Sequence, residues 1–429
     1  MTASPSTLES TPHRSFAALH HPGYRSFFFS MAGAMMADSV EHVISYWVIF
    51  QKFHSAQLAG FAVISHWLPF LLLSIYSGGL ADRFDPRRLI QIGMALFMLV
   101  SIAWGVLFIT DSLQVWHARV LLILHGCAGV LWSPSSQVLL HYIVPREHLQ
   151  SAVRLNASSR YLGLLLGPAV GGGILLLMGP SYGILFNALL YLPTVLWLWK
   201  APYGPKFSTQ QRPARALRGI ADIASTLRSV GRDRTLLSMT LLAGGASMFI
   251  GNSYQAQMPG FASDLGHGNA DLSYSLLLAA DAAGALCAGL LLESRGLLKA
   301  DPRTAFMLAM LWCGALASFA LSHAYVLSMM LLFVAGFVEL SFNSMAQTLV
   351  QLRAPTDIRG RVIGVYSMSA LGMRMFSGIT VGLAGGYVGI HYSLAASALA
   401  LLVLIIVLFA SGMRLQDRDA ALGTTAGKD

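Results

Sequence analysis

Three ionisable side chains lie in one apolar stretch near the start of the chain. Asp38, Glu41 and His42 fall within residues 25–50, where most other side chains are apolar. Their spacing of three and four residues places them on one face of a helix. In a membrane-spanning helix each charge costs roughly 2.5–3.5 kcal/mol on insertion scales, and a desolvated carboxyl group can load a proton near neutral pH. We therefore expect Asp38, with Glu41, to couple proton movement to another process, and His42 to assist the relay.

A plainer interpretation exists for each of these residues. Asp38 and Glu41 would then be structural hydrogen-bond acceptors for a neighbouring helix, and His42 would be a satisfied core histidine. Three further charges lie inside apolar runs of the second half of the chain: Asp281, Glu339 and Arg374. A buried Arg374 needs a partner, and Glu339 or Asp281 is the candidate if their helices adjoin. Such a pair would either gate the transport path or hold the two helices in register.

Polar amides and aromatic groups also occur within apolar runs. Asn252, Tyr254, Gln255 and Gln257 end one run, Asn343 lies in another, and Trp67, Trp132 and Tyr161 add aromatic surface. Groups of this kind orient a small solute without full ionic desolvation. The alternative is hydrogen bonding between helices for the polar groups and ordinary packing for the aromatic rings. We predict a substrate cavity that includes Asn252, Tyr254, Gln255, Asn343 and Trp67, with Asp38, Glu339 and Arg374 as further candidate cavity residues.

Composition indicates which elements must position these residues. The 429-residue chain is 55% hydrophobic and 11% charged, with a mean hydropathy of +0.62, which is more apolar surface than one soluble core can hide. A membrane span needs roughly 20 apolar residues. Twelve such runs are present: 25–50, 57–79, 89–109, 115–143, 156–178, 181–199, 235–258, 271–293, 304–322, 325–351, 362–386 and 391–412. The sequence therefore predicts an all-α membrane protein with twelve transmembrane helices.

The basic residues predict its topology. Connections on one side hold 25 of the 28 Lys and Arg residues, and basic short loops stay in the cytoplasm. We expect a multi-pass protein of a bacterial-type inner membrane with both ends in the cytoplasm. The predicted organisation is a cytoplasmic N-terminal segment without a signal peptide (1–24), a six-helix half (25–199), a basic cytoplasmic linker (200–234), a second six-helix half (235–412) and a cytoplasmic tail (413–429).

Weak internal repetition supports the division into two halves. Gln137 precedes Pro145 by eight residues, and Gln347 precedes Pro355 by the same interval. A second repeat joins the connection after the second run to that after the eighth, where Gly78 and Asp82 correspond to Gly289 and Glu293. We interpret the sequence GGLADRFDPRRL (78–89) as a conformational latch: Gly78 and Gly79 permit close helix approach, while Asp82 pairs with Arg83, Arg87 or Arg88, or faces a neighbouring helix N-terminus. The alternative is a basic stop loop.

This loop resembles the signature of the major facilitator superfamily. Two stretches, WLPFLLLSIYSGGLADRFDPRRL (67–89) and VPREHLQSAVRLNASSRYLGLLLGPAVGG (144–172), resemble the branch that contains the enterobactin exporter and related drug-efflux proteins. The resemblance implies two pseudo-symmetric six-helix halves around a central cavity that opens to each side in turn, and supports a role for an aspartate in the first span. The glycine pattern of the fifth run, Gly163, Gly167, Pro168, Gly171 and Gly172, is similar to a motif of proton-coupled exporters. Arg154 occupies a position where that motif has glycine. The alternative is a generic close-packing helix.

Together these features predict a secondary transporter, a proton-coupled exporter of a small amphipathic molecule such as a siderophore-like metabolite or a drug. The alternative within transport is an importer or lysophospholipid carrier. We expect the proton gradient in place of a cofactor, and neither a metal site nor a nucleic-acid partner, since Cys127, Cys287 and Cys313 lie in apolar runs and the basic residues lie between runs. A membrane enzyme is disfavoured because no metallohydrolase or phosphate-loop motif is present, and a sensor is disfavoured because the tails are short for an output domain. The partners expected are the solute and the lipid bilayer, with a functional monomer.

Overall fold

The computed structural model describes residues 15–53, 56–207, 219–251, 253–265 and 270–425. In these ranges the secondary structure is helical. The first half contains six α-helices: α1 (Pro22–Phe53), α2 (Ala56–Arg83), α3 (Pro86–Ile109), α4 (Val115–Ile143), α5 (Leu149–Leu190) and α6 (Leu192–Lys200). Short 3-10 turns lie at η1 (Ala17–His20), η2 (Arg146–His148) and η3 (Pro205–Phe207).

The second half begins after the linker helix α7 (Ile220–Arg232). Its α-helices are α8 (Arg234–Phe249), α9 (Ser253–Ala256), α10 (Met258–Asp264), α11 (Ala270–Arg295), α12 (Pro302–Ala320), α13 (Tyr325–Arg353), α14 (Arg359–Ser367), α15 (Arg374–Ser377), α16 (Ala384–Val388) and α17 (Ile390–Thr425). Two π-helical segments, η4 (Met368–Gly372) and η5 (Gly378–Leu383), join α14, α15 and α16 into one continuous span.

Ten segments of the described chain are long and apolar enough to cross a membrane. The remaining two predicted spans are α1, whose acidic residues Asp38 and Glu41 lower its hydropathy, and the first part of α5, which contains Arg154 and Arg160. Gly179, with φ of 70°, breaks α5 and separates the fifth span from the sixth. The predicted twelve-helix organisation therefore accounts for the helices observed.

One predicted span is interrupted. The run 235–258 was expected to be continuous, but α8 ends at Phe249 and Gly251 follows with φ of 51°. A side chain at Gly251 would meet the hydroxyl oxygen of Ser377 at 2.5 Å. Glycine is therefore needed here both for the left-handed backbone and for close contact with the eleventh span.

The third helix of each half starts in the same way. Asp85 accepts a hydrogen bond from the backbone N–H of Arg87 and is followed by Pro86, while Asp301 accepts one from Thr304 and is followed by Pro302. An Asp N-cap with proline at the first helical position satisfies a free N–H group and presets the backbone angle φ. This shared Asp-Pro start is a local trace of the predicted duplication.

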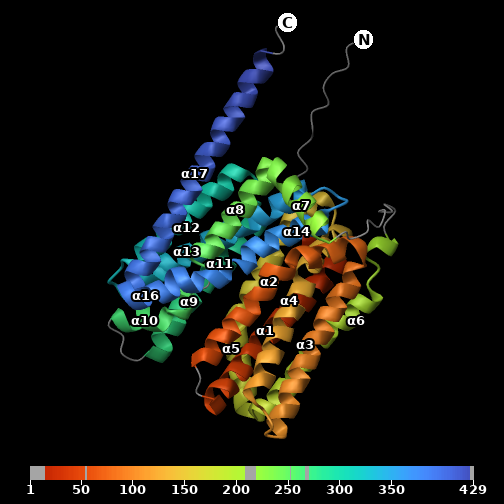
Figure 1. Cartoon of the computed structure of the whole chain (residues 1–429), viewed down its shortest axis with the longest axis vertical. Helices are drawn as coiled ribbons and strands as arrows, with labels where there is room; N and C mark the ends of the chain where they lie inside the picture. The colour runs from red at the N-terminus through yellow and green to blue at the C-terminus, as the bar shows by residue number, and fades with distance from the viewer. Residues whose placement is uncertain (1–14, 54–55, 208–218, 252, 266–269, 426–429) are drawn as a thin grey trace.

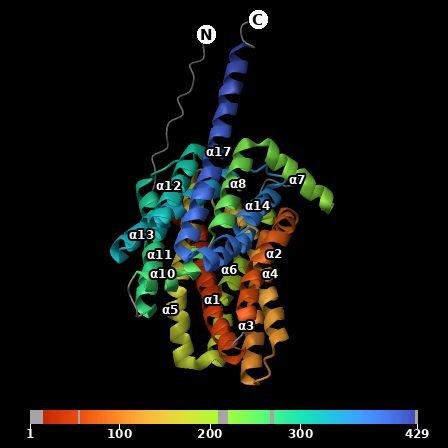
Figure 2. The same cartoon turned by 60° about the vertical axis from the view of Figure 1, so that its left-hand side comes forward.

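The two halves form two adjacent bundles, the first coloured red to yellow and the second green to blue in Figures 1 and 2. Between them, α2 packs along α14 and η4, and α5 packs against α11 and α13. Helices α2, α4, α11 and α13 end at the same membrane face, where α7 also lies. We call this the linker face.

Candidate functional site

A cavity of about 480 Å³ lies between the two halves. Its walls come from α1 to α5 on one side and from α13, α14, η4 and α15 on the other. Among the predicted residues, Asp38, His42, Trp67, Asn343 and Arg374 line it. Both aromatic and hydrogen-bonding groups contribute further surface, namely Phe70, Phe97, Trp132, Tyr161, Tyr366, Gln137, Asn156 and Gln347. Such a mixture suits an amphipathic ligand.

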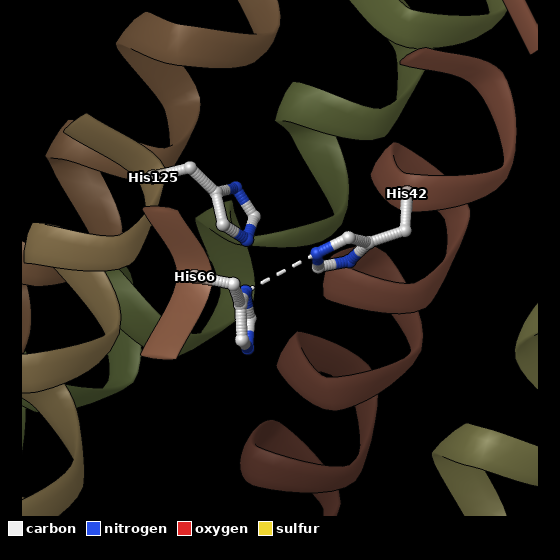
Figure 3. Close-up of side chains that lie close together, drawn as sticks. All are labelled: His42, His66 and His125. Carbon is white, nitrogen blue, oxygen red and sulfur yellow. Dashed lines mark hydrogen bonds between the residues drawn. The ribbon is translucent and has the colours of Figure 1, made fainter. Parts of the chain in front are cut away.

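The acidic cluster of α1 is organised by two histidines that the sequence analysis did not select. His125 of α4 lies between the two carboxylates, with Nδ1 2.8 Å from Glu41 Oε1 and Nε2 2.9 Å from Asp38 Oδ1. His66 of α2 approaches His42, with Nδ1 of the former 3.3 Å from Nε2 of the latter. Figure 3 shows the three imidazole rings directed toward one another from three helices.

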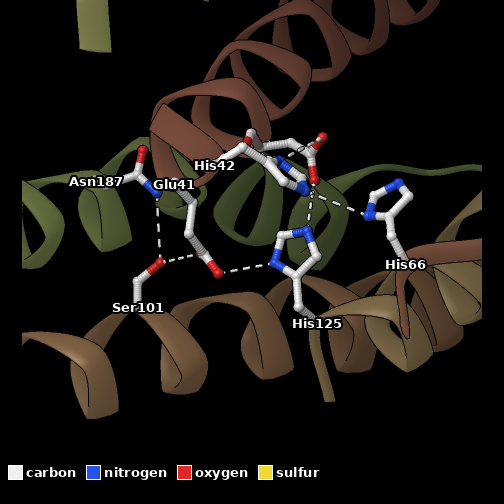
Figure 4. A network of polar contacts seen from close by, with 7 residues as sticks. Glu41, His42, His66, Ser101, His125 and Asn187 are labelled. Atoms are coloured by element: carbon white, nitrogen blue, oxygen red, sulfur yellow. Dashed lines mark hydrogen bonds and ion pairs between the residues drawn. The ribbon is translucent and has the colours of Figure 1, made fainter. Parts of the chain in front are cut away.

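Further hydrogen bonds fix the orientation of this cluster. The other ring nitrogen of His42, Nδ1, lies 2.7 Å from the backbone carbonyl oxygen of Asp38. Ser101 of α3 donates to Glu41 Oε2 at 2.5 Å, and Asn187 of α5 donates to the Ser101 hydroxyl at 3.4 Å. The network thus joins five helices of the first half (Figure 4). The sequence analysis correctly placed the three α1 residues together; whether they carry protons stays a prediction.

A second ionisable cluster lies inside the second half. The hydroxyl of Tyr254 in α9 is 3.1 Å from Asp281 Oδ2 in α11 and 3.4 Å from Glu339 Oε2 in α13. Gln255 also donates to Asp281 Oδ2, at 3.2 Å. Tyr254 and Gln255 therefore hold acidic side chains, and they are not among the residues that line the cavity. After the break at Gly251, Tyr254 and Gln255 contact the acidic side chains of the second half, and their role in binding a solute stays a prediction.

Arg374 does not form the predicted ion pair. Within the described residues no atom pair at or below 4.0 Å joins its guanidinium to Asp281 or Glu339, and the guanidinium carbon lies 5.0 Å from the centre of the Trp67 ring. Its Nε is buried and has no hydrogen-bond partner in the described part of the chain. A cation–π contact stabilises such a group, and the Arg374 side chain also lines the cavity. Arg160 of α5 lines the same cavity.

Two predicted amides remain. Asn252 lies outside the described residues. Gln257 donates from Nε2 to the backbone oxygen of Val381 at 3.1 Å, which ties α10 to the eleventh span. It therefore follows the alternative interpretation, hydrogen bonding between helices.

The proposed latch residue Asp82 faces the N-terminus of a helix in the other half. Its carboxylate accepts from the backbone N–H groups of Gly360 and Arg361, at 2.5 and 3.0 Å, at the start of α14. Arg361 also places Nε 3.7 Å from Asp82 Oδ2 and Nη1 3.3 Å from Asp222 of the linker helix α7. The positive end of a helix and a guanidinium both stabilise a carboxylate. Asp82 thus connects the first half to the second half and, through Arg361, to the linker.

Close backbone approach makes this contact geometrically feasible. A Cβ atom on Gly78 would lie 2.0 Å from the carbonyl oxygen of Gly360, and one on Gly360 would lie 2.1 Å from that of Gly78. Gly79 is also buried. The three loop arginines make other contacts: Arg87 pairs with Asp85 at 2.6 Å, Arg88 donates to Gln91 at 2.8 Å, and Arg83 lies over the Phe84 ring. The helix N-terminus, together with Arg361, was therefore the correct alternative for Asp82.

The repeated motif makes a related contact between α11 and α5. Glu293 accepts from the Ser151 hydroxyl, and a side chain at Gly289 would meet the Ser158 hydroxyl at 1.9 Å. Arg154 donates to three backbone oxygens at and just beyond the end of α11, those of Leu292, Leu297 and Leu298. A cation at a helix C-terminus is stabilising. The departure from the exporter motif at Arg154 thus has a structural role that joins the two halves.

The exporter-like glycines bring α5 against α1. Added Cβ atoms on Gly163, Gly167 and Gly171 would lie 2.9 Å from Met35 Cβ, 2.2 Å from Ser39 Cβ and 3.1 Å from Val43 Cβ. The side chain of Pro168 lies outside the described set, and Gly172 faces open space. The glycine face therefore supports helix packing, and the helix that it contacts carries Asp38 and Glu41.

This contact predicts a specific pair of phenotypes. We expect Gly167→Ala to cost about 1–3 kcal/mol through overpacking and to lower transport, because the neighbouring atom is a Cβ next to the α1 backbone. Gly172→Ala introduces the same methyl group with no heavy atom within 4 Å and should leave both properties unchanged. Thermal unfolding of the purified variants in detergent measures the difference. Equal stability of the two would show that α5 does not depend on this close approach.

Comparison with known proteins places this geometry in a family. A family model described as transmembrane secretion effector matches residues 13–425. The chain is 26% identical to the staphyloferrin A transporter of Staphylococcus aureus over 47% of this chain and 51% of that protein. It is 24% identical to the multidrug efflux pump Tap of Mycolicibacterium fortuitum over 84% of this chain and 88% of the relative. It is 25% identical to the uncharacterised MFS-type transporter YfiS of Bacillus subtilis over 42% of each chain. The chain thus spans about half of the length of two of these curated relatives.

Solved structures match the fold. The Escherichia coli fucose:proton symporter FucP superposes with a TM-score of 0.68 at 12% identity, covering 90% of this chain and 98% of that one. A bacterial homologue of the iron transporter ferroportin in an outward-facing state superposes with a TM-score of 0.67 at 18% identity, covering 90% and 99%. These neighbours confirm the predicted twelve-helix fold, and the family consists of transporters rather than enzymes. The chain therefore belongs to the transmembrane secretion effector family of the major facilitator superfamily of membrane transporters.

Proposed function

We propose that this transporter is a proton-coupled exporter of small amphipathic molecules that carry an acidic group. The observation that carries the proposal is the buried carboxyl pair Asp281 and Glu339, bridged by one phenol. Glu339 directly precedes Leu340, which lines the cavity. A proton bound by this pair is thus placed behind the wall of the solute cavity.

The bridging geometry favours one proton on the pair. The Tyr254 hydroxyl has a single hydrogen, which it can donate to only one of its two acidic neighbours. Oδ1 of Asp281 is buried and has no hydrogen-bond partner among the described residues, and an ionised carboxylate without a partner is costly to bury. No described Lys, Arg or His lies within 4.0 Å of either carboxylate. Two acidic groups in this setting do not both ionise, so their proton is the one available for exchange.

The cavity supports an acidic, amphipathic solute. Arg160 and Arg374 come from opposite halves and both line it, and the Nε–H of Arg374 lacks a protein acceptor in the described chain. Guanidinium groups bind carboxylates through directed hydrogen bonds, while Trp67, Trp132 and Tyr366 offer apolar surface. The names of the relatives, a siderophore transporter and a multidrug efflux pump, agree with a siderophore-like metabolite or an acidic drug.

The distribution of basic residues supports an orientation in the membrane, and the contacts between the halves support a transport cycle. The basic connections lie at the linker face, so we propose that this face is cytoplasmic in a bacterial inner membrane, with both chain ends on that side. The hydrogen bonds of Asp82, Glu293 and Arg154 join the halves there. Release of these contacts would open the cavity to the cytoplasm for solute loading. One chain supplies the whole cavity, which supports a functional monomer.

Proteoliposomes test the proposal. Purified full-length protein would be reconstituted with a pH-sensitive dye trapped inside, and an outward gradient of a carboxylate siderophore or an acidic amphipathic drug would be imposed. We expect protons to move inward as the solute leaves, with no signal in protein-free liposomes. Solute movement with protons in the same direction would identify an importer. Movement of lysophospholipid without any proton signal would identify a lipid carrier, and either result would overturn the proposed export function.

A further inference from the structure

His42 and His66 line the cavity and His125 lies beside them, and together the three imidazoles have the composition of a metal site. We infer that His42, His66 and His125 bind a divalent transition-metal ion of the zinc and cobalt class, which reaches them through the cavity. This site revises the expectation from sequence that the chain has no metal site, and it goes beyond the proposed export of an organic acid. It uses none of the residues of the Asp281 and Glu339 pair.

The nitrogen positions fit one ion. Each histidine offers one ring nitrogen, and the three ligand atoms lie within 4.8 Å of one another. Zinc–nitrogen bonds of about 2.0–2.1 Å at tetrahedral angles place two ligand nitrogens about 3.3 Å apart. The Nε2 atom of His42 and the Nδ1 atom of His66 already lie 3.3 Å apart. Only the third imidazole needs to move closer, as the arrangement in Figure 3 allows.

The groups behind the histidines are those that orient metal ligands. A metal-binding histidine usually donates its second ring N–H to a carboxylate or a backbone carbonyl group, which fixes the tautomer and the ring plane. His42 can donate from Nδ1 to the carbonyl oxygen of Asp38, and His125 from Nδ1 to Glu41, which Ser101 holds in turn. In both rings Nε2 then faces the centre of the cluster. This outer arrangement is present in addition to the three ligands.

A fourth ligand and an access route are also present. Asp38 Oδ1 lies 2.9 Å from Nε2 of His125, so an ion bound at Nε2 would displace the hydrogen-bonded proton and could include the carboxylate in its coordination shell. Asp38, His42 and His66 all line the cavity. Three neutral imidazoles and one carboxylate suit Zn²⁺, Co²⁺, Ni²⁺ or Cu²⁺, whereas Mg²⁺ and Ca²⁺ prefer oxygen ligands.

Metal titration of the purified full-length protein tests this site. Co²⁺ serves as the spectroscopic probe, because tetrahedral coordination is visible in its absorption spectrum, and Zn²⁺ serves as the competitor in calorimetry. We expect one Co²⁺ per chain with a tetrahedral spectrum, displaced by Zn²⁺ and unaffected by Mg²⁺. His66→Ala should weaken Zn²⁺ binding by about 100-fold or more, at least the loss caused by removing an outer-shell partner.

Matched variants separate this site from other histidines and from misfolding. His323→Ala removes an exposed loop histidine and should bind Zn²⁺ like the wild type. His66→Gln keeps a hydrogen-bonding side chain next to His42 but no imidazole, so a correctly folded variant, identified by its elution profile, should also lose the tetrahedral spectrum. Equal Zn²⁺ affinity of wild type, His66→Ala and His66→Gln would overturn the site. Solute-driven proton movement is measured separately without added metal, so that outcome would leave the proposed export function standing.

Discussion

Glu339→Gln and Asp281→Asn are expected to abolish solute-driven proton movement, reducing it to the level of protein-free liposomes. Each amide has nearly the shape of the carboxyl group that it replaces, but it neither binds nor releases a proton at physiological pH. The two carboxyl groups share the Tyr254 hydroxyl. We propose that they also compete for one proton, so the loss of either carboxyl group removes the pair that holds and releases it. Reconstituted protein with a trapped pH dye measures this effect.

Exchange of solute against solute provides the discriminating readout for these variants. Counterflow of labelled against unlabelled solute needs no net proton movement, so a variant that has lost only its coupling should retain it. Asp264→Asn is the matched control, because this acidic residue belongs to the same half but is 55% exposed and lies next to His391. Asp264→Asn should show the same solute-driven proton movement as the wild type. Persistent proton movement in the double variant Glu339→Gln/Asp281→Asn would place the proton carrier elsewhere, and Asp38 would then be the next group to examine.

The sequence was sufficient for the fold because membrane spans are specified locally. Each span is a continuous apolar run that must satisfy its own backbone hydrogen bonds as a helix, and the basic connections and repeated motifs indicated the two halves. The local sequence also led to one wrong prediction, a continuous span over 235–258. The run 235–258 is apolar over most of its length, and Gly251 marks the break after which Tyr254 and Gln255 contact Asp281.

Contacts between side chains of different helices were harder to predict from the sequence. His66 and His125 lie in apolar runs, as His42 does, and the cost of an ionisable group in a membrane applies to all three. Applying that criterion to histidine in every run would have selected them. Nothing local, however, indicates that the second and fourth spans meet the first at one depth. The same limit explains why Arg374 was expected to pair with an acid and lies over Trp67.

The contact of Asp82 with α14 was predictable only in part. A carboxylate at the end of a span was recognisable as a candidate for a helix N-terminus, since free N–H groups at the start of a helix bind anions. Its partners, Gly360 and Arg361, lie 278 and 279 residues further along the chain. Their identity depends on how the two halves dock, so only the structure supplies it.

Asp82→Asn should shift the protein strongly toward states that are open at the linker face. The amide oxygen can still accept hydrogen bonds, but the negative charge that faces two backbone N–H groups and Arg361 is lost. Breaking a buried charged contact costs about 3 kcal/mol, which corresponds to about a 100-fold change in the ratio of closed to open protein. Labelling of Gln137→Cys by a membrane-impermeant maleimide measures the change, with Cys127, Cys287 and Cys313 replaced by Ala.

Gln137 is a suitable reporter because it lines the cavity and contacts Gln351 of the other half at 3.3 Å, so the closed linker face covers it. Asp85→Asn is the matched control: this carboxylate lies in the same loop, but its ion pair with Arg87 stays within the first half, and Asn still caps a helix. Asp85→Asn combined with Gln137→Cys should be labelled at the same rate as the protein that carries Gln137→Cys alone. Equal rates in all three proteins would mean that Asp82 stabilises the loop and not the closed state. Faster labelling confined to Asp82→Asn would identify its contact with α14 as an interaction that holds the linker face closed. The Asp82 contact joins the two halves and must break when they separate, whereas the ion pair of Asp85 stays within the first half.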